Sequence, residues 1–282
     1  MTITNLTDTA TLSNGVELPW FGLGVYKAEP GPEAEQAVVW ALEAGYRSID
    51  TAALYGNESD VGRAIRRSGV PRSEIFVTTK LWNDSHGFDK ALQAFDDSLN
   101  RLEMDYVDLY LVHWPVGQPS DTPIYNETWQ AMEAIYKSGR ARAIGVSNFM
   151  VHHLQTLLPT VNVAPMVNQV EFHPWLQQPD LQAFCRAHQI QLEAWAPIMR
   201  GRALEVPELV KLGEKYGKNA VQVSLRWMLD KGIVTIPKSV KKERIKNNTD
   251  VFDFELEPAD IALIDSLDRG QRFGPNPNKF NF

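Results

Sequence analysis

The sequence has little cysteine and no surplus of positive charge. Cys185 is the only cysteine among 282 residues, which excludes an internal disulfide and a zinc cluster built from cysteines. Its amphipathic setting, residues 181–185, is typical of a packed core thiol, and the low cysteine content fits a reducing compartment. The net charge of −7 and the pI of about 5.4 argue against a surface that binds nucleic acid or an anionic membrane.

Long apolar runs are also missing. No stretch approaches the roughly 20 apolar residues of a membrane span, and residues 1–6 lack the basic and apolar segments of a secretory signal. We therefore expect a cytoplasmic protein. A hydrophobic content of 44 % is still enough for a sizeable core. No internal boundary is evident, so residues 1–282 are expected to form one domain, a length that suits an α/β barrel.

Two further kinds of site lack their signatures. Gly22-Leu23-Gly24 begins like a dinucleotide-binding fingerprint, but Lys27 stands where the third glycine belongs. A tight turn at a barrel mouth is therefore favoured over a Rossmann fold. The pair His152-His153 and the lone His173 have no partner at the spacing of metal ligands, so we predict no metal.

What the sequence does contain is an alternation of strand-like and helical segments. Residues 9–12 and 16–18 flank Asn14-Gly15, which predicts an N-terminal β-hairpin with positive φ angles in its turn. Amphipathic stretches such as 33–44 separate eight short runs, and further helices are expected at 206–216, 220–230 and 258–267. The pattern predicts an α/β protein, a (β/α)8 TIM barrel with an N-terminal hairpin and an extra C-terminal helix. The eight runs are 22–26, 47–52, 75–82, 107–113, 141–147, 166–172, 191–197 and 233–237.

Titratable side chains follow three successive runs. Asp50, Lys80 and His113 stand at or near the C-terminal ends of the second, third and fourth runs, and Tyr55 lies in the loop after Asp50. Each residue alone has an ordinary structural explanation. Together they mark the end of a parallel barrel where catalysis occurs, and these four residue types suit proton transfer to a carbonyl oxygen.

At this point a resemblance becomes plain. The motif at residues 45–52, with Tyr55, Lys80 and His113-Trp114-Pro115, resembles the aldo-keto reductase family, and residues 144–149 and 236–239 extend the likeness. The chain is most similar to short bacterial members of the 2,5-diketogluconate and glyoxal reductase type. The resemblance implies NADPH-dependent reduction of carbonyls. Tyr55 would donate the proton and His113 would orient the carbonyl. We expect Lys80, held by Asp50, to lower the pKa of Tyr55.

The resemblance also implies a cofactor site. The nicotinamide carboxamide would contact Ser147, Asn148 and Gln169, and Trp195 would replace the usual tyrosine that stacks on the ring. Ala196 replaces a serine that contacts the pyrophosphate in the family. Lys238, Ser239 and Arg244 would bind the adenosine 2′-phosphate, and Asn248 would contact the adenine. The other expected cofactor-binding residues are Ile198 and Val240. The alternative is that residues 238–242 form only a solvated helix start.

Three aromatic residues, Tyr26, Trp82 and Trp114, follow strand-like runs and are expected to wall the substrate pocket. The short loop at 114–122 and the fifteen residues after Leu267 predict an open mouth. Such a mouth favours small activated carbonyls: glyoxals, α-keto esters, aromatic aldehydes and keto-sugar acids. We expect a monomer whose only partner is a small carbonyl substrate. The alternatives are a non-catalytic nicotinamide-binding redox sensor or partner-binding protein, and a barrel lyase or isomerase.

Overall fold

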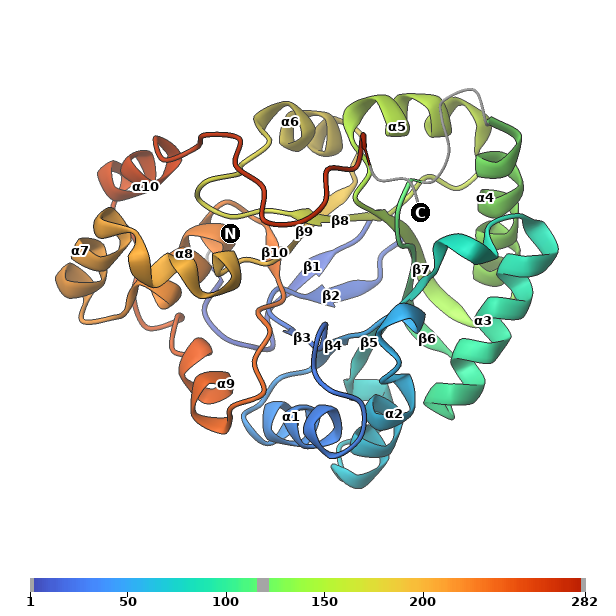
Figure 1. Ribbon diagram of the computed structural model, residues 1–282, viewed down its shortest axis with the longest axis horizontal. Helices are drawn as coiled ribbons and strands as arrows, with labels where there is room; N and C mark the ends of the chain where they lie inside the picture. Colours follow the sequence, from blue (N-terminus) through green and yellow to red (C-terminus); the bar gives the residue numbers. More distant parts are fainter. Residues whose placement is uncertain (1–2, 116–121, 280–282) are drawn as a thin grey trace.

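The computed structural model describes residues 3–115 and 122–279. Its centre is a parallel sheet in which neighbouring strands follow the order of the chain (Figure 1). All eight expected runs form strands. They are β3 (Leu23–Gly24), β4 (Ser48–Asp50), β5 (Phe76–Leu81), β6 (Val107–Val112), β7 (Ala141–Ser147), β8 (Val167–Glu171), β9 (Gln191–Trp195) and β10 (Val234–Thr235).

The first and last strands of this sheet meet and close it. The backbone N–H of Thr235 donates to the carbonyl of Trp20 at 3.0 Å, and that of Gly22 donates to the carbonyl of Thr235 at 3.0 Å. A second parallel bridge joins Gly24 to Lys238. The predicted (β/α)8 barrel is therefore confirmed.

The glycines at the start of the barrel permit a close approach of strands. A Cβ atom on Gly22 would lie 2.8 Å from Oγ of Ser48, and one on Gly24 would lie 3.0 Å from the carbonyl oxygen of Ile236. The first distance is shorter than real Cβ contacts and the second is tighter than most of them, so a larger residue at either position would force its neighbours to shift. The segment that begins like a dinucleotide fingerprint is thus part of the barrel wall.

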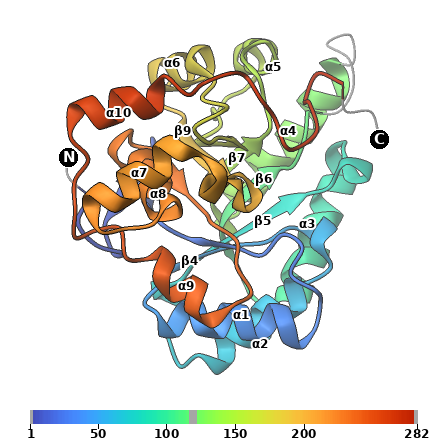
Figure 2. The ribbon, with the colours of Figure 1, turned by 60° about the vertical axis from the view of Figure 1, so that its left-hand side comes forward.

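Helices surround the barrel on its outside (Figure 2). The predicted helices at 33–44, 206–216, 220–230 and 258–267 all form, with bounds that differ by at most two residues. The helices are α1 (Pro32–Glu43), α2 (Glu58–Arg67), α3 (Phe88–Leu102), α4 (Thr122–Lys137), α5 (Val151–Leu157), α6 (Pro179–Ala187), α7 (Pro207–Tyr216), α8 (Ala220–Asp230), α9 (Lys242–Asn248) and α10 (Pro258–Asp265).

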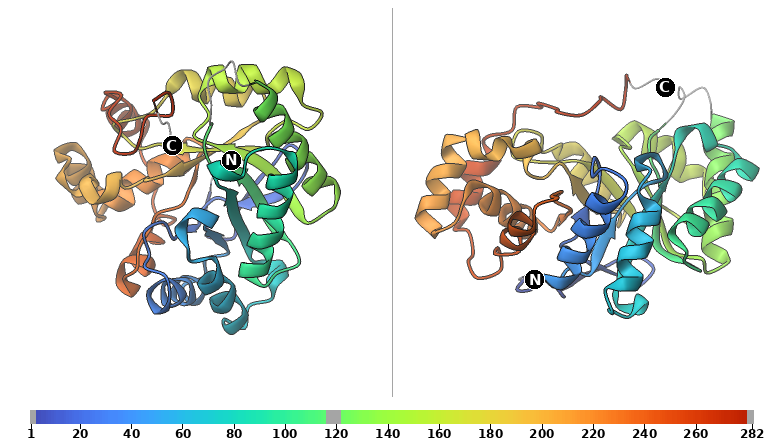
Figure 3. Two further views of the ribbon diagram at one scale, coloured as in Figure 1. Left: turned by 45° about the vertical axis from the view of Figure 1, so that its right-hand side comes forward. Right: turned by 60° about the horizontal axis from the view of Figure 1, so that its bottom comes forward.

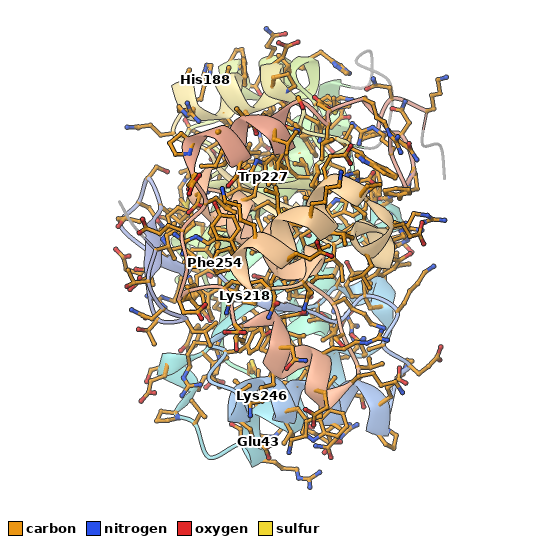
Figure 4. All side chains as sticks on the ribbon, turned by 90° about the vertical axis from the view of Figure 1, so that its left-hand side faces the viewer. Glu43, His188, Lys218, Trp227, Lys246 and Phe254 are labelled. Carbon is orange, nitrogen blue, oxygen red and sulfur yellow. The ribbon has the colours of Figure 1, made fainter. Side chains whose placement is uncertain are left out.

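Helix α8 ties the extra C-terminal helix to the barrel. Its Trp227, labelled in Figure 4, is fully buried. The Trp227 ring stacks on Phe172 with centroids 5.5 Å apart. The indole N–H of Trp227 donates to Asp265 at the end of α10 at 2.9 Å. One side chain therefore joins the barrel wall, α8 and α10. Cys185 on α6 is also fully buried, and burial raises its pKa to about 12, as expected of a core thiol.

The predicted hairpin covers the end of the barrel where the strands begin, opposite the C-terminal tail (Figure 3). It pairs β1 (Thr9–Thr11) with β2 (Glu17–Pro19) in antiparallel register. The expected positive φ angles occur only at Gly15, where φ is 84°. Asn14 instead uses its side chain, which accepts from Val16 N–H at 3.1 Å and donates to the carbonyl of Arg142 at 2.9 Å. In the described part of the chain, no helix has the length and apolar character needed to cross a membrane.

Candidate active site

The ends of β4 and β5 hold a buried ion pair. Nζ of Lys80 lies 2.7 and 2.8 Å from the two carboxylate oxygens of Asp50, and 2.8 Å from the carbonyl of Thr51. The Lys80 side chain is 0 % exposed and that of Asp50 is 3 % exposed. Because an ammonium group has three hydrogens, these three oxygens use its full donor capacity. Asp50 and Lys80 are thus brought together as the sequence predicts.

Tyr55 lies beside this pair, on the short helix η1 (Ala53–Tyr55). Its hydroxyl is 3.4 Å from Nζ of Lys80, and that nitrogen is 5.0 Å from the centroid of the ring. Since closer oxygens occupy the ammonium hydrogens, the contact at 3.4 Å is a weak hydrogen bond. Lys80 therefore acts on the phenol mainly through its charge.

The expected lowering of the Tyr55 pKa is wrong. Burial raises the pKa of Tyr55 well above its ordinary value of about 10, and the negative charge of Asp50 raises it further. Asp50 lies against the Lys80 ammonium, so its negative charge opposes the effect of the Lys80 charge on the phenol. The hydroxyl is consequently protonated at neutral pH, which is the form required to donate a proton.

His113 follows β6 and faces the same mouth. Its ring meets that of Tyr55 edge-on at 5.7 Å between centroids, and that of Trp82 at 5.2 Å. Burial lowers the pKa of His113 well below its ordinary value, and the charge of Lys80 lowers it further. The imidazole is therefore neutral and carries one N–H donor. Its Nδ1 is buried and makes no hydrogen bond to the described residues.

The ends of β7, β8 and β9 form a second polar group. Oγ of Ser147 donates to the carbonyl of Gln169 at 2.8 Å. The amide of Asn148 donates to the carbonyl of His113 at 2.9 Å and accepts from the indole N–H of Trp195 at 2.8 Å. These four predicted cofactor residues are thus brought together, and Asn148 links them to His113.

Glu193 joins the two groups, and the sequence reasoning missed it. Nε2 of Gln169 donates to Oδ2 of Asp50 at 2.7 Å and to Oε2 of Glu193 at 2.8 Å. Glu193 is 0 % exposed and lies opposite Gln169 in the parallel register of β8 and β9. The sequence held a signal for Glu193, because it stands two positions before Trp195 and residues two apart on a strand point to the same face of the sheet.

The residues expected around the 2′-phosphate lie in the segment after β10 and on α9. Nζ of Lys238 donates to the carbonyl of Lys27 at 3.0 Å, and burial lowers its pKa. Ser239 accepts from the N–H of Lys241, and Arg244 is exposed on α9. Among the other members of the set, Asn248 is buried, and Ile198 and Val240 are half-buried. Figure 4 shows α9 along the surface next to the end of α1 that carries Glu43.

Two of the three predicted substrate aromatics border the catalytic rings. The Tyr26 ring is 5.0 Å from that of Tyr55 and is 47 % exposed, and Trp82 meets His113 as described above. Trp114 is nearly buried, with 7 % of its surface exposed. Most of the predicted short loop, residues 116–121, lies outside the described residues.

The tail after α10 is short, so the sequence predicts an open mouth. In the structure this tail narrows the mouth. The backbone N–H groups of Phe273 and Gly274 donate to Oε1 of the fully buried Glu171 at 2.6 and 3.1 Å. A Cβ atom on Gly274 would lie 2.3 Å from the indole of Trp195. Figure 1 shows this tail, in dark red, crossing near β8 and β9. Trp195, which is predicted to stack on the nicotinamide, therefore packs closely against the tail.

A hollow also lies at the opposite end of the barrel. Its lining includes Thr9, Glu17, Arg47, Phe76 and Arg142. These residues belong to the hairpin and to the beginnings of strands, whereas chemistry in this fold occurs where strands end. In the described ranges, 3–115 and 122–279, no three His, Cys, Asp or Glu side chains form a group able to hold a metal ion.

A closed (β/α)8 barrel with an Asp–Tyr–Lys–His group at its mouth defines an oxidoreductase of the aldo-keto reductase type. The model of the Aldo/keto reductase family matches residues 21–269, and the chain belongs to this family. It is 53 % identical over 279 residues to a glyoxal reductase of Bacillus subtilis (strain 168), with 99 % of each chain covered.

Solved structures agree with this family and fold. The aldo-keto reductase MGS-M4, from a deep-sea metagenome library, is 44 % identical, with a TM-score of 0.94 over 97 % of this chain and 100 % of that one. A variant of Gox0644 in complex with NADPH is 41 % identical, with a TM-score of 0.91 over 97 % and 98 % of the two chains. The family resemblance predicted from the motifs is confirmed.

Proposed function

We propose that the protein uses NADPH to reduce small activated aldehydes and ketones to alcohols. The observation that carries the proposal is the juxtaposition of a protonated Tyr55, a neutral His113 and the buried Lys80–Asp50 pair at the end of the barrel where strands finish. The glyoxal reductase activity named for the Bacillus relative and the NADPH bound to the Gox0644 variant support it.

The residues present fit a nicotinamide cofactor. Both hydrogens of the Gln169 amide nitrogen are used by carboxylates, which leaves its oxygen for a donor such as a carboxamide. Trp195 is half-buried and offers an aromatic face. Lys238 and Arg244 supply cationic groups suited to a phosphate dianion. When bound, NADPH supplies a hydride to the carbonyl carbon.

Tyr55 and His113 divide the work at the carbonyl oxygen. His113 is a neutral imidazole with one N–H donor. Through this N–H it donates a hydrogen bond that holds and polarises the carbonyl. Tyr55 gives its proton to the oxygen as negative charge develops there. The phenolate that remains lies 3.4 Å from Nζ of Lys80, whose positive charge stabilises it. The product is an alcohol, and Tyr55 regains its proton from solvent.

The mouth favours small substrates with reactive carbonyls. Tyr26 and Trp82 border the catalytic rings, and the tail at Gly274 narrows the opposite side. Few contacts are then available for a large substrate, and each contact discriminates by only about 1–3 kcal/mol. Glyoxals, α-keto esters, aromatic aldehydes and keto-sugar acids are therefore proposed as substrates.

The test is NADPH oxidation, followed by absorbance, with methylglyoxal and a nitrobenzaldehyde. We expect turnover with both and alcohol as the product. Binding of NADPH without oxidation by any carbonyl in a broad screen would instead identify a redox sensor or a partner-binding protein. Absence of NADPH binding would point to a barrel lyase or isomerase.

A further inference from the structure

Glu193 is a carboxylic acid inside the barrel to which the proposed reaction gives no role. It is 0 % exposed, and its neighbours in register are Gln169 on β8 and Val234 on β10. Opposite residues in parallel strands point to the same face, so Glu193 and Gln169 share the barrel interior. Burying a carboxyl costs free energy unless hydrogen bonds compensate, and its Oε1 has no hydrogen-bond partner in the described chain.

The compensating contact is with Gln169. An amide side chain presents two N–H donors on one side and a carbonyl oxygen on the other. Here the nitrogen lies between two carboxylates, at 2.7 Å from Asp50 and 2.8 Å from Glu193. Only the nitrogen side can face two acceptors. The amide oxygen is consequently turned away from both of them.

We propose that Glu193 is a positioning residue that fixes the Gln169 amide so that its oxygen accepts a hydrogen bond from the cofactor carboxamide. The inference rests on the proposed function, because it requires a nicotinamide at this site. Without Glu193, one N–H of Gln169 loses its acceptor, and the soft terminal torsion of the side chain leaves the amide free to rotate. The oxygen is then no longer presented in one direction.

The charged and titratable groups that face Glu193 are Asp50 on β4, Lys80 on β5 and Tyr55 on η1. Burial raises the pKa of Glu193 to about 7, and Asp50 raises it as well, against the opposing effects of Gln169 and Lys80. A hydrogen bond to an ionised carboxylate is stronger than one to the neutral acid. Gln169 should therefore be held more firmly, and bind cofactor more tightly, as the pH rises through about 7.

The first experiment measures the dissociation constant of NADPH by calorimetry for Glu193→Leu and Glu193→Gln. Leucine removes the acceptor and should weaken binding by about tenfold or more. Glutamine keeps an acceptor oxygen but cannot ionise, so its affinity should stay within about threefold of the parent at low pH and lose its pH dependence. The control is Glu133→Gln, which alters another buried carboxyl, hydrogen-bonded to Asn162 on the barrel exterior, and should leave binding unchanged.

Each result has a definite meaning. Equal dissociation constants for Glu193→Leu and the parent, or equal losses in both variants at Glu193, would overturn the positioning role. Failure of the parent protein itself to bind NADPH would overturn the proposed function instead.

A second experiment needs no substitution at Glu193 and so remains decisive if Glu193→Leu does not fold. The side-chain amide protons of Gln169, assigned by comparison with Gln169→Leu, are followed by NMR as the pH is changed. Their shifts should titrate with a midpoint near the pKa of about 7 given by burial of Glu193. Gln169 amide protons that exchange with water as rapidly as those of an exposed glutamine would contradict the contact, whereas protected protons with constant shifts from pH about 5 to about 9 would support it and place the ionisation of Glu193 below this range.

Discussion

Two buried aspartates stand at opposite ends of the barrel, and each is paired with cations. Asp108, near the start of β6, is 1 % exposed and contacts Arg72 and Arg142 at 2.8 Å, with Val77 N–H as a third donor at 2.9 Å. Asp50, at the end of β4, contacts Lys80 and shares Gln169 with Glu193. In residue type and burial the two sites are nearly alike.

Their partners differ in where they come from. The guanidinium groups that reach Asp108 lie at the surface, with 22 % and 45 % of their side chains exposed, and they complete a closed structural contact. Lys80 approaches Asp50 from inside the barrel and stands next to Tyr55. A buried Asp with a cation is therefore not in itself a catalytic signature. The end of the strand on which it stands decides its use.

Among the substitutions that test this comparison of the two barrel ends, Tyr55→Phe at the Asp50 end is expected to have the largest effect. The ring remains and only the transferable proton is lost, so carbonyl reduction should fall by roughly 10²–10⁴, or more, while NADPH binding survives. Steady-state kinetics with methylglyoxal and calorimetry with NADPH measure the two quantities. Near-normal turnover would show that another group, most plausibly His113, delivers the proton.

A second pair of substitutions tests the predicted cofactor-binding residues at the same end of the barrel. Lys238→Ala or Arg244→Ala should narrow the preference for NADPH over NADH by roughly 1.5–3 kcal/mol, the value of a hydrogen bond to a charged group. Dissociation constants for both cofactors give the difference directly. Equal affinity for NADPH and NADH in the unmodified protein would remove the phosphate-site assignment and favour a solvated helix start at residues 238–242.

At the other end, Asp108→Asn should change stability and not chemistry. It removes the charge that pairs with two arginines and should lower the free energy of unfolding by about 1–3 kcal/mol. Thermal unfolding and kcat for methylglyoxal are the two readouts. A large loss of kcat in a folded Asp108→Asn protein would show that the aspartate at this end of the barrel is not purely structural.

Substrate preference should depend mainly on carbonyl reactivity. Values of kcat/KM for methylglyoxal and a nitrobenzaldehyde should exceed that for a 3-ketosteroid, because each pocket contact contributes only about 1–3 kcal/mol. A matched series of activated and unactivated aldehydes of equal size separates reactivity from fit. A clear preference for the steroid would disprove the small-substrate assignment.

The smallest expected effect concerns pH. Because the pKa of Tyr55 is raised, its hydroxyl keeps its proton until the pH is well above 10. The reductive kcat at saturating NADPH should therefore stay nearly constant from pH about 6 to about 9, whereas alcohol oxidation, which needs the phenolate, should rise with pH. A fall of reductive kcat with a midpoint near 8 would indicate the lowered pKa that the sequence reasoning expected.

The barrel and the catalytic group follow from the sequence because both depend on local patterns. Asp50, Lys80 and His113 end strand-like runs, and ends of parallel strands meet whatever the details of packing. The pKa of Tyr55 could not be foreseen in the same way, because it is set by how deeply the phenol is buried and by the negative charge of Asp50 beside it.

Glu193 and the tail escaped prediction for a different reason. The partners of Glu193 are 24 and 143 positions away in sequence, and only closure of the barrel brings Asp50, Gln169 and Glu193 together. Phe273 meets Glu171 across 102 positions. The spacing of Glu193 to Trp195 indicates only the face of the strand on which it stands and not its distant partners, whereas a strand end is visible within a few residues.

The attachment of the tail to Glu171 also sets an order of events while the chain is being made. The barrel closes when Thr235 reaches Trp20, and Gly274 emerges 39 residues later. At a synthesis rate of roughly 5–20 residues per second, that interval lasts about 2–8 s. A nascent chain that closes its barrel during this interval has a Trp195 that is not yet covered. The segment that completes the rim of the mouth is thus delivered by the ribosome after all the strands of the barrel.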